Sequence, residues 1–467
     1  MYIYDSVQKR KLLFEPQDPQ NVTLYVCGPT VYDDAHLGHA KSALAFDLLA
    51  RIIRANGYQL TFARNITDID DKIIKRAAES KMEIAAFAQT YANAYHRDMD
   101  ALGIARPDIE PKATESIEAM LAMVETLVQK DCAYATDEGD VYFDTSKDSD
   151  YLSISKRIQD EGDTQSRVQS SSAKRNKADF ALWKGVHDST TAFESAYGKG
   201  RPGWHLECSA MIEKHLTCKD HAYAVDIHGG GADLLFPHHE NEAAQTRCAT
   251  GHEIAKYWMH NGFVTIDGEK MSKSLGNSFF LKDALKYYHG DVLRYYLLST
   301  HYRANFNFSE EDLIASKRRL DKLYRLKKRL FGLPDNATET AFQNELLHAL
   351  NDDLNVSQAY ALIDAMIQHA NEGLDANPKD KLLKRDSMAN LAFIVKLLGF
   401  GAHNPFEYFQ FGIDEKTKAT IEHLIRQRNE AKHAKDFERS DTIRNEITAL
   451  GVTLMDTPQG TFWERIN

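Results

Sequence analysis

The stretch that decides the fold begins with Val22-Thr-Leu-Tyr-Val-Cys27-Gly28, continues from His36-Leu-Gly-His39 to Gly57, and ends with residues 59–67. Residues 22–28 are apolar and stop at a Gly-Pro pair, which is typical of a strand. The apolar residues from His39 to Gly57 recur at helical spacing, and Gly57 is a common helix stop. Residues 59–67 again have strand character. Strand, helix and strand of these lengths predict a βαβ unit and hence a parallel sheet.

Composition and charge narrow the class of protein. The 467 residues are 43% hydrophobic and 27% charged, which is ordinary globular usage and excludes collagen-like or wholly disordered chains. The net charge is −11, so any nucleic-acid partner must meet local basic surfaces. We expect no membrane span and no signal peptide. Five cysteines argue against a disulfide framework and favour a reducing, cytoplasmic compartment.

Outward from the first strands, the pattern changes several times along the chain. Helical segments continue to about residue 131, a polar run covers residues 159–177, and a sheet pattern resumes near residue 223. Asp267-Gly268 between short apolar runs predicts a hairpin. Ser309 is a candidate N-cap of a long basic helix. We therefore predict an α/β fold: a Rossmann-like parallel-sheet domain with an inserted module, followed by an α-helical bundle and a small C-terminal domain. The expected segments are 1–111, 112–200 (the insertion), 201–260, 261–308, 309–400 and 401–467.

Two motifs have the chemistry of phosphate binding. His36, Gly38 and His39 open the first long helix, where free N–H groups and the helix dipole favour anions. Taken alone, two surface histidines near a helix start would explain them equally well. Lys270 and Lys273 flank Met271-Ser272 beside the predicted hairpin, and two lysines there can neutralise charge developing on a phosphate. Taken alone, they would be a solvated loop. The presence of both motifs in one chain makes those simpler interpretations improbable.

A third constellation resembles a metal site. His238 and Glu242 are four residues apart and share one helix face, and Cys27 and Cys208 could complete a zinc-binding set. His239 is a comparably spaced alternative to His238. Spacing alone leaves this site a weak hypothesis, because buried structural cysteines are more common than cysteine ligands.

The two phosphate motifs resemble the HIGH and KMSKS motifs of class I aminoacyl-tRNA synthetases, with Leu37 in place of isoleucine. Longer strings resemble the cysteinyl-tRNA synthetase family along essentially the whole chain. Residues 215–225 and 160–174 depart from the family pattern without touching a motif residue. The strings that carry the resemblance are residues 25–33, 65–73, 201–209, 226–242 and 457–463.

The resemblance implies the activity, the cofactors and the partners. The activity would be ATP-dependent activation of L-cysteine to cysteinyl-adenylate and its transfer to the 3′-terminal ribose of tRNA(Cys). One Zn²⁺ per chain would bind the substrate thiolate, and Mg²⁺ would accompany ATP. The C-terminal domain would bind the anticodon, residues 261–308 would carry the KMSKS loop and contact the tRNA stem, and the chain would act as a monomer.

The resemblance also implies the site residues. The zinc ligands would be Cys27, Cys208, His238 and Glu242. His36, His39, Lys270 and Lys273 would be catalytic and, with Gly38, Gly231 and Asp233, would bind ATP. The cysteine substrate would contact Gly28, Thr67, Trp204 and His228.

Several alternatives and two tRNA-facing candidates remain at this point. A mycothiol-pathway cysteine ligase shares the catalytic core but lacks the far C-terminal part. An inactive synthetase-like RNA-binding or zinc-sensing protein would not need every motif intact. The basic helix 313–333 is the best candidate for contact with the tRNA backbone, and Trp463 is a candidate for stacking on an unpaired base.

Overall fold

The computed structural model describes residues 1–156, 174–186, 191–218, 220–266, 279–333, 338–457 and 460–466, together with the backbone of residues 269–270. Several predictions lie outside these residues: most of the polar run 159–177 and of the segment 160–174, the Asp267-Gly268 turn, and Lys273.

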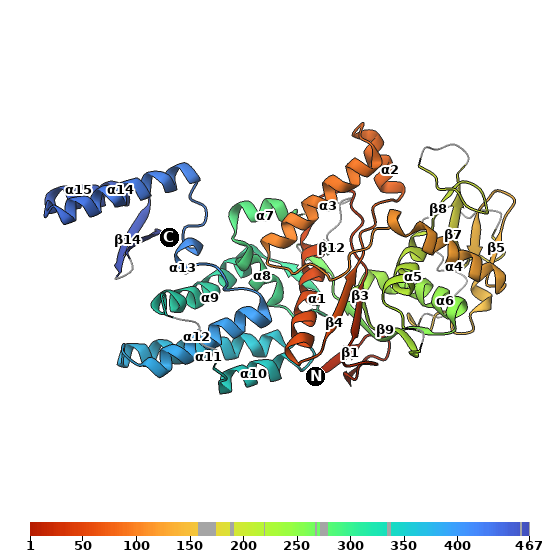
Figure 1. The fold of residues 1–467 in the computed structure, drawn as a ribbon, viewed down its shortest axis with the longest axis horizontal. Coiled ribbons are helices and arrows are strands. Elements are labelled where there is room, and N and C mark those ends of the chain that lie inside the picture. Colours follow the sequence, from red (N-terminus) through yellow and green to blue (C-terminus); the bar gives the residue numbers. More distant parts are fainter. Residues whose placement is uncertain are drawn as a thin grey trace.

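The centre of the molecule is a four-stranded parallel sheet, which confirms the predicted α/β class (Figure 1). Leu24 pairs with Phe62 on one side and with Ile227 on the other, which fixes the register of the inner strand. Every residue of that strand is buried, as expected for a parallel sheet covered on both faces. The strands, in sheet order, are β10 (Glu253–Asn261), β9 (Tyr223–Gly231), β3 (Val22–Val26) and β4 (Leu60–Arg64).

The predicted crossover helix is α1 (Leu37–Ala55), which connects β3 to β4. Its first turn is closed by a capping box in which His36 is the N-cap and His39 is the third helical residue. Its buried residues, among them Leu44, Phe46 and Leu48, form one core with the sheet and with the helices that follow.

The insertion between β4 and β9 builds a second sheet with its own core. Its four strands are antiparallel in the order β5-β6-β7-β8 and lie at the far right of Figure 1. The helices α5 and α6 pack between this module and the parallel sheet. The helices and strands between β4 and β9 are α2 (Asp71–Glu79), α3 (Ile84–Ala101), α4 (Ile117–Gln129), β5 (Ala133–Ala135), β6 (Val141–Phe143), β7 (Phe180–Gly185), β8 (Gly200–Pro202) and α5 (Trp204–His215). The helix α6 (Glu240–Thr250) follows β9.

A small three-stranded sheet follows β10. Thr265 pairs with Lys270 and Ile266 with Glu269, so the strands on both sides of the predicted turn form the expected antiparallel pair. The third strand pairs in parallel with the first, Val264 opposite Phe306. The elements are β11 (Val264–Ile266), β12 (Glu269–Lys270), α7 (Leu281–Tyr287), α8 (Gly290–Leu298) and β13 (Phe306–Phe308).

The remainder is helical apart from one terminal hairpin, and it occupies the left of Figure 1. Ser309 caps α9 by accepting a hydrogen bond from the Asp312 N–H, as predicted. The helices of the bundle are α9 (Glu310–Arg329), α10 (Ala341–Leu350), α11 (Val356–Ala376) and α12 (Lys381–Leu398). The last elements are α13 (Pro405–Tyr408), α14 (Glu415–His433), α15 (Phe437–Ala449), β14 (Val452–Thr457) and β15 (Gly460–Arg465).

The segment between the bundle and the C-terminal elements is packed into the molecule. Phe400, Phe406 and Tyr408 are buried, and the Tyr408 hydroxyl donates to Asp321 of α9 at 2.7 Å. The apolar cluster formed by α14, α15 and the terminal hairpin is separate from the two larger cores. At the N-terminus, β1 (Tyr2–Asp5) and β2 (Arg10–Leu13) form a hairpin. None of the described helices is long and apolar enough to cross a membrane.

Candidate active site

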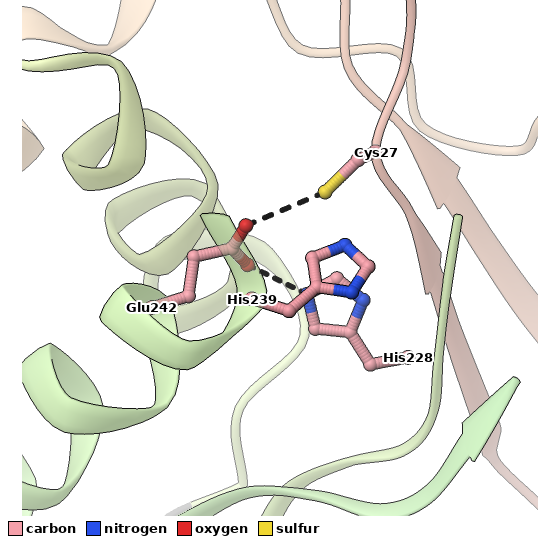
Figure 2. Close-up of side chains that lie close together, drawn as sticks. All are labelled: Cys27, His228, His239 and Glu242. Atoms are coloured by element: carbon pink, nitrogen blue, oxygen red, sulfur yellow. Dashed lines mark hydrogen bonds and ion pairs between the residues drawn. The ribbon is translucent and has the colours of Figure 1, made fainter. Parts of the chain in front are cut away.

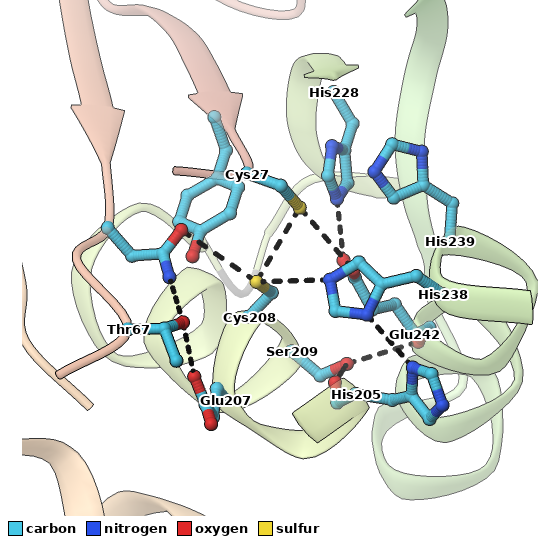
Figure 3. A network of polar contacts seen from close by, with 12 residues as sticks. Cys27, Thr67, His205, Glu207, Cys208, Ser209, His228, His238, His239 and Glu242 are labelled. Atoms are coloured by element: carbon cyan, nitrogen blue, oxygen red, sulfur yellow. Dashed lines mark hydrogen bonds and ion pairs between the residues drawn. The ribbon is translucent and has the colours of Figure 1, made fainter. Parts of the chain in front are cut away.

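The predicted metal ligands meet at the carboxyl ends of the parallel strands. From β3 the chain runs to β4 on one side, and later returns to β9 and β10 on the other side. Ligands bind to open parallel sheets at such a reversal of strand order. Cys27 follows β3 directly and Cys208 lies on α5. His238 lies in the turn that leads into α6, and Glu242 lies on α6 itself (Figure 3).

The four predicted donors lie within metal-ligating distance of one another. Cys27 Sγ is 3.5 Å from Cys208 Sγ and 3.5 Å from Glu242 Oε1. His238 Nε2 is 3.6 Å from Cys208 Sγ and 2.8 Å from Glu242 Oε1. A tetrahedral zinc ion would set S–S edges of about 3.8 Å and S–N edges of about 3.5 Å. The contacts between sulfur and its neighbours therefore fit such an ion, while the imidazole and the carboxylate lie closer than it would set them.

A second candidate set shares two of these donors. His228 and His239, with Cys27 and Glu242, also bring their ligand atoms within 4.8 Å of one another (Figure 2). His228 Nε2 lies 2.6 Å from Glu242 Oε2, and His239 Nδ1 lies 2.8 Å from His260 Nε2. The set with His238 contains both thiols, which zinc prefers as ligands, so this set is the better candidate.

His238 is held in place from both sides. The Trp204 ring stacks on it with a centroid distance of 4.1 Å and an interplanar angle of 23°. His205 Nδ1 lies 2.9 Å from His238 Nδ1, so the other ring nitrogen faces the two thiols. Partners of this kind orient a metal-binding imidazole. Burial, followed by the charge of His238, lowers the pKa of His205 to about 3, so that ring is neutral at pH 7.

The electrostatics of the cluster favour a bound cation. Burial opposes ionisation of Glu242, but His238 and His228 outweigh it and hold its pKa well below the ordinary value. Hydrogen bonds from Cys27 and His238 likewise outweigh burial at Cys208 and lower its pKa to about 6. Burial and the neighbouring Cys208 raise the pKa of Cys27. Ionising the second thiol therefore requires additional positive charge, which a divalent metal supplies.

The predicted cysteine-binding residues lie around this cluster. The Thr67 hydroxyl is buried and donates to Glu207 Oε2 at 2.7 Å, while Asn65 donates to Thr67 at 3.2 Å. The Gly28 N–H donates to Asn65 Oδ1 at 2.8 Å, and a Cβ on Gly28 would lie 1.6 Å from the Asn65 carbonyl oxygen. Only glycine fits this close approach. Trp204 is 44% exposed and marks the solvent side of the cluster.

The HLGH motif presents both imidazoles in one tautomer. His36 Nδ1 accepts a hydrogen bond from the Gly38 N–H at 3.1 Å, and His39 Nδ1 accepts one from the His36 N–H at 3.2 Å. The two rings stack with a centroid distance of 3.9 Å. In a neutral ring whose Nδ1 accepts, the proton is on Nε2. In the neutral state each ring therefore carries its proton on Nε2, at a helix N-terminus.

Residues shortly after the KMSKS segment contact the HLGH motif. Lys270 is the last residue of β12, and the description resumes at Phe279. There the Leu37 N–H donates to the Phe279 carbonyl, and the Leu281 N–H donates to the Ala35 carbonyl at 2.8 Å. The start of α7, seven residues after Ser274, is therefore joined to the HLGH turn. Lys273 and the side chain of Lys270 lie outside the described residues.

The glycine run at the end of β9 has mixed roles. A Cβ on Gly229 would lie 2.2 Å from the Phe46 ring of α1, so this glycine is required by packing. A Cβ on Gly231 would lie 2.5 Å from Asp233 Oδ1, so the Asp233 side chain folds back over the end of the strand. Gly231 and Asp233 therefore lie at the carboxyl end of a strand of the parallel sheet, and their contact with ATP stays a prediction.

The cations of α9 fall into two groups. Five of them have partners within the protein. Lys317 pairs with Asp321 of the same helix, whereas the other four contact other elements: Arg319 with Asp364, Lys327 with carbonyls 401–403, Lys328 with Glu464, and Arg329 with Asp375. Arg318, Lys322 and Arg325 are exposed and share one face of the helix. The outward charge of this helix is therefore smaller than its sequence suggests.

The stacking role predicted for Trp463 is wrong. Trp463 is 4% exposed and lies in the apolar cluster of the C-terminal elements with Ile421, Ile447 and Val452. It stabilises this small core, which has few other large side chains.

Sequence reasoning missed several residues of the network in Figure 3. Asn65, His205 and Glu207 adjoin predicted residues in the chain and fall within the quoted motif strings, but no role was assigned to them. A further residue, His260, is the last but one of β10, and its Nε2 lies 2.8 Å from His239 Nδ1. Its position at the carboxyl end of a sheet strand is the signal that could have identified it.

Comparison with known proteins identifies the family. Residues 13–318 match the model of the class I (C) tRNA synthetase catalytic domain, and residues 414–463 match the cysteinyl-tRNA ligase anticodon binding domain. Proteins named cysteine–tRNA ligase are 66% identical in Sulfurimonas denitrificans and 53% identical in Helicobacter acinonychis, each over 100% of both chains. The chain belongs to the cysteine–tRNA ligase family.

Structural neighbours of this ligase-family chain show the same class I fold. A methionyl-tRNA synthetase from Mycobacterium tuberculosis, in complex with methionyl-adenylate, matches with a TM-score of 0.60 at 16% identity, covering 84% of this chain and 94% of that one. A ternary complex of Agrobacterium radiobacter LeuRS with tRNA and LeuAMS matches with a TM-score of 0.58 at 12% identity, covering 85% of this chain and 86% of that one. At these identities the likeness concerns the fold.

Proposed function

We propose that this member of the cysteine–tRNA ligase family activates L-cysteine with Mg-ATP, releasing pyrophosphate, and transfers the cysteinyl group to the 2′-hydroxyl of the 3′-terminal ribose of tRNA(Cys). The observation that carries the proposal is the largely buried cluster of two thiols, an imidazole and a carboxylate, whose Cys27 follows the same strand, β3, that leads into the HLGH motif. It combines a thiol-selective site and a phosphate site at one edge of the sheet.

Cys27, Cys208, His238 and Glu242 would hold one zinc ion. When bound, zinc supplies a Lewis acid that prefers the thiolate of cysteine to the hydroxyl of serine. The protein supplies the orientation: Trp204 and His205 fix His238, and His228 holds the other oxygen of Glu242. Four protein donors already make a tetrahedral set, so we expect Glu242 to be the displaceable donor or the site to expand to five donors.

The remaining steps need no protein nucleophile, because the substrate carboxylate attacks the α-phosphorus of ATP. The Nε2–H groups of His36 and His39 would donate to the phosphates. Lys270 and Lys273 would neutralise the charge that develops on the departing pyrophosphate. Positioning and electrostatic stabilisation account for most of the catalysis in such phosphoryl-type steps.

The other predicted residues would complete the two substrate sites. Gly28, Thr67, Trp204 and His228 would surround the cysteine, supported by their positions around the metal cluster. Gly231 and Asp233 would hold the ribose of ATP, because a carboxylate accepts hydrogen bonds from hydroxyls.

We infer that the tRNA lies along the exposed cations of α9 and reaches the C-terminal elements. Arg318, Lys322 and Arg325 would contact phosphates, and residues 414–463 would contact the anticodon. We propose a monomer, because one chain carries every predicted motif. A cytoplasmic location fits two thiols that must stay reduced to bind metal.

Cysteine-dependent exchange of radiolabelled pyrophosphate into ATP tests the proposal. We expect exchange with cysteine, none with serine, and cysteinylation of tRNA(Cys). No exchange by the zinc-loaded protein would contradict the proposed enzyme and favour a binding protein. Transfer to an amino sugar in place of tRNA would favour the mycothiol-type ligase, which the match of residues 414–463 disfavours.

A further inference from the structure

One lysine in the catalytic core is buried without an acidic partner. Lys41 lies on α1, two residues after His39, and is 2% exposed. Its ammonium group donates to the Leu297 carbonyl at 2.7 Å and to the Thr300 carbonyl at 2.7 Å. It also lies 5.3 Å from the centroid of the Phe306 ring. Lys41 therefore caps the C-terminal end of α8, where a positive charge meets the negative end of the helix dipole.

The charged groups around Lys41 are engaged with one another. Asp353 accepts hydrogen bonds from the Tyr4 N–H, the Tyr302 hydroxyl and the Arg303 guanidinium, and it lies 3.6 Å from His301. Within the described part of the chain, no carboxylate pairs with Lys41, and burial lowers its pKa to about 7. Burial also lowers the pKa of His301 below its ordinary value, and the charge of Lys41 is among the smaller causes.

The cost of burying this charge suggests a role beyond folding, since apolar side chains often replace buried charges without loss of stability. Lys41 links the helix that carries one phosphate motif, through α8 and the small sheet, to the strand that ends at the other. It lies on the helix that the HLGH motif opens. Its acceptors end α8 and begin the loop to β13, and Phe306 of β13 pairs with Val264 of β11. The strand β11 in turn pairs with β12, which ends at Lys270.

We propose that Lys41 is a positioning residue that holds the HLGH helix against the sheet presenting Lys270, so that its charge is required for adenylate formation although it contacts no substrate. The role rests on the proposed function, because it concerns the alignment of the two ATP motifs. A displacement of about 1 Å between reacting groups can cost about 10²-fold in rate.

The first test compares Lys41→Met with Lys41→Arg in cysteine-dependent pyrophosphate exchange. Methionine keeps the apolar stem and removes the charge, whereas arginine keeps the charge. We expect Lys41→Met to lower kcat by about 10–100-fold with the cysteine KM changed less than about twofold, and Lys41→Arg to recover most of the rate. An unchanged kcat in a folded Lys41→Met protein would overturn the proposal.

Lys327→Met is the matched control. Lys327 also donates to backbone carbonyls, those of Gly401, Ala402 and His403, but it lies on α9, away from the ATP motifs. We expect this variant to lose thermal stability and to keep its pyrophosphate exchange. If both methionine variants lose kcat in proportion to stability, Lys41 has a purely structural role and the proposal is wrong.

Hydrogen exchange gives a readout that does not require activity. The Leu281 N–H donates to the Ala35 carbonyl, which joins the first residue of α7 to the HLGH turn. In Lys41→Met we expect faster exchange of this amide, while the Arg465 N–H, which donates to Phe409, stays unchanged. Equal exchange in wild type and variant would overturn the proposal. If the wild type shows no pyrophosphate exchange, the proposed function fails while this measurement still decides the role of Lys41.

The pH profile provides a test without the methionine variant. A lysine loses its charge as the pH rises through its pKa, here about 7, whereas arginine stays charged. We expect the kcat of the wild type to fall on the alkaline side of this value, and the fall to move to higher pH in Lys41→Arg. Superimposable alkaline limbs in the two proteins would contradict a requirement for the Lys41 charge.

Discussion

The metal cluster consists of Cys27, Cys208, His238 and Glu242. The start of α1, from His36 to His39, is called the nucleotide edge because we propose that ATP binds there. Both regions follow from the carboxyl end of β3, but they are built in different ways. Cys208, His238 and Glu242 are almost fully buried, and each depends on side chains far away in the sequence. His36 and His39 are half-buried and are oriented by hydrogen bonds within one helical turn. The metal cluster is therefore preorganised by the whole fold, whereas His36 and His39 are preorganised by a local capping box. Changes in the first region should remove selectivity and binding, and changes in the second should reduce rate.

The largest effect is expected from Cys208→Ser, which removes a buried thiolate donor. We expect loss of bound zinc and a fall in cysteine activation of at least about 10³-fold, since discrimination between near-isosteric substrates requires about 10⁴–10⁵ from this site. Zinc content, circular dichroism and pyrophosphate exchange are measured together. Cys248→Ser is the control, because Cys248 lies on the same helix, α6, as Glu242 but outside both candidate metal sets. Retention of zinc and activity in Cys208→Ser would show that the cluster is not the metal site.

Cobalt substitution tests whether the substrate thiol binds the metal of the same cluster. With Co²⁺ in place of Zn²⁺, adding cysteine should produce a new sulfur-to-metal charge-transfer band, and adding serine should not. Absence of any change with cysteine would make the metal structural. Selectivity would then depend on the contacts of Thr67, Trp204 and His228.

The nucleotide edge is tested by Lys273→Ala. Loss of a charge that acts mainly as pyrophosphate leaves should lower kcat by about 10²–10³-fold with little change in the cysteine KM. Lys286→Ala is the control, since Lys286 lies on the nearby helix α7 and pairs with Asp283 on the surface. A rise in KM with kcat unchanged would mean that Lys273 binds substrate in the ground state only.

The sequence predicted what local rules determine. The α1 boundaries, the Ser309 cap and the β11–β12 pair follow from periodicity, capping and turn chemistry over a few residues. The contact between His205 and His238 and the support of Thr67 by Glu207 could not be predicted, because they join residues 33 and 140 positions apart through packing of the whole domain. The stacking role predicted for Trp463 was wrong because an aromatic residue in a short terminal strand gives no periodic signal for the small core that buries it.

Removing the C-terminal elements should weaken tRNA binding while leaving both regions of the active site functional. Truncation after Gly412 keeps the buried side chains of Phe400, Phe406 and Tyr408, and Tyr408 contacts α9 of the bundle. A chain that ended at Gly399 would lack these side chains and would leave a gap beside the bundle. We expect pyrophosphate exchange to stay within about threefold. The tRNA KM should rise by about 10²-fold, because the elements that match the anticodon binding domain, and their contacts with tRNA phosphates, are removed. Equal loss of both activities in a folded truncated protein would contradict this division.

The smallest effect is expected at the exposed face of α9, far from both regions of the active site. Replacing Arg318, Lys322 and Arg325 by alanine removes exposed cations that make no ion pair with another described residue. Each phosphate contact contributes about 0.9 to the slope of log affinity against log salt, so the slope should become shallower by about 2–3. The tRNA KM should rise by about tenfold at low salt, and pyrophosphate exchange should not change. The control replaces Arg319 and Arg329, which pair with Asp364 and Asp375, and should reduce stability more than tRNA binding. An unchanged salt slope in the triple variant would mean that the tRNA does not follow this helix and that its phosphates meet another basic surface.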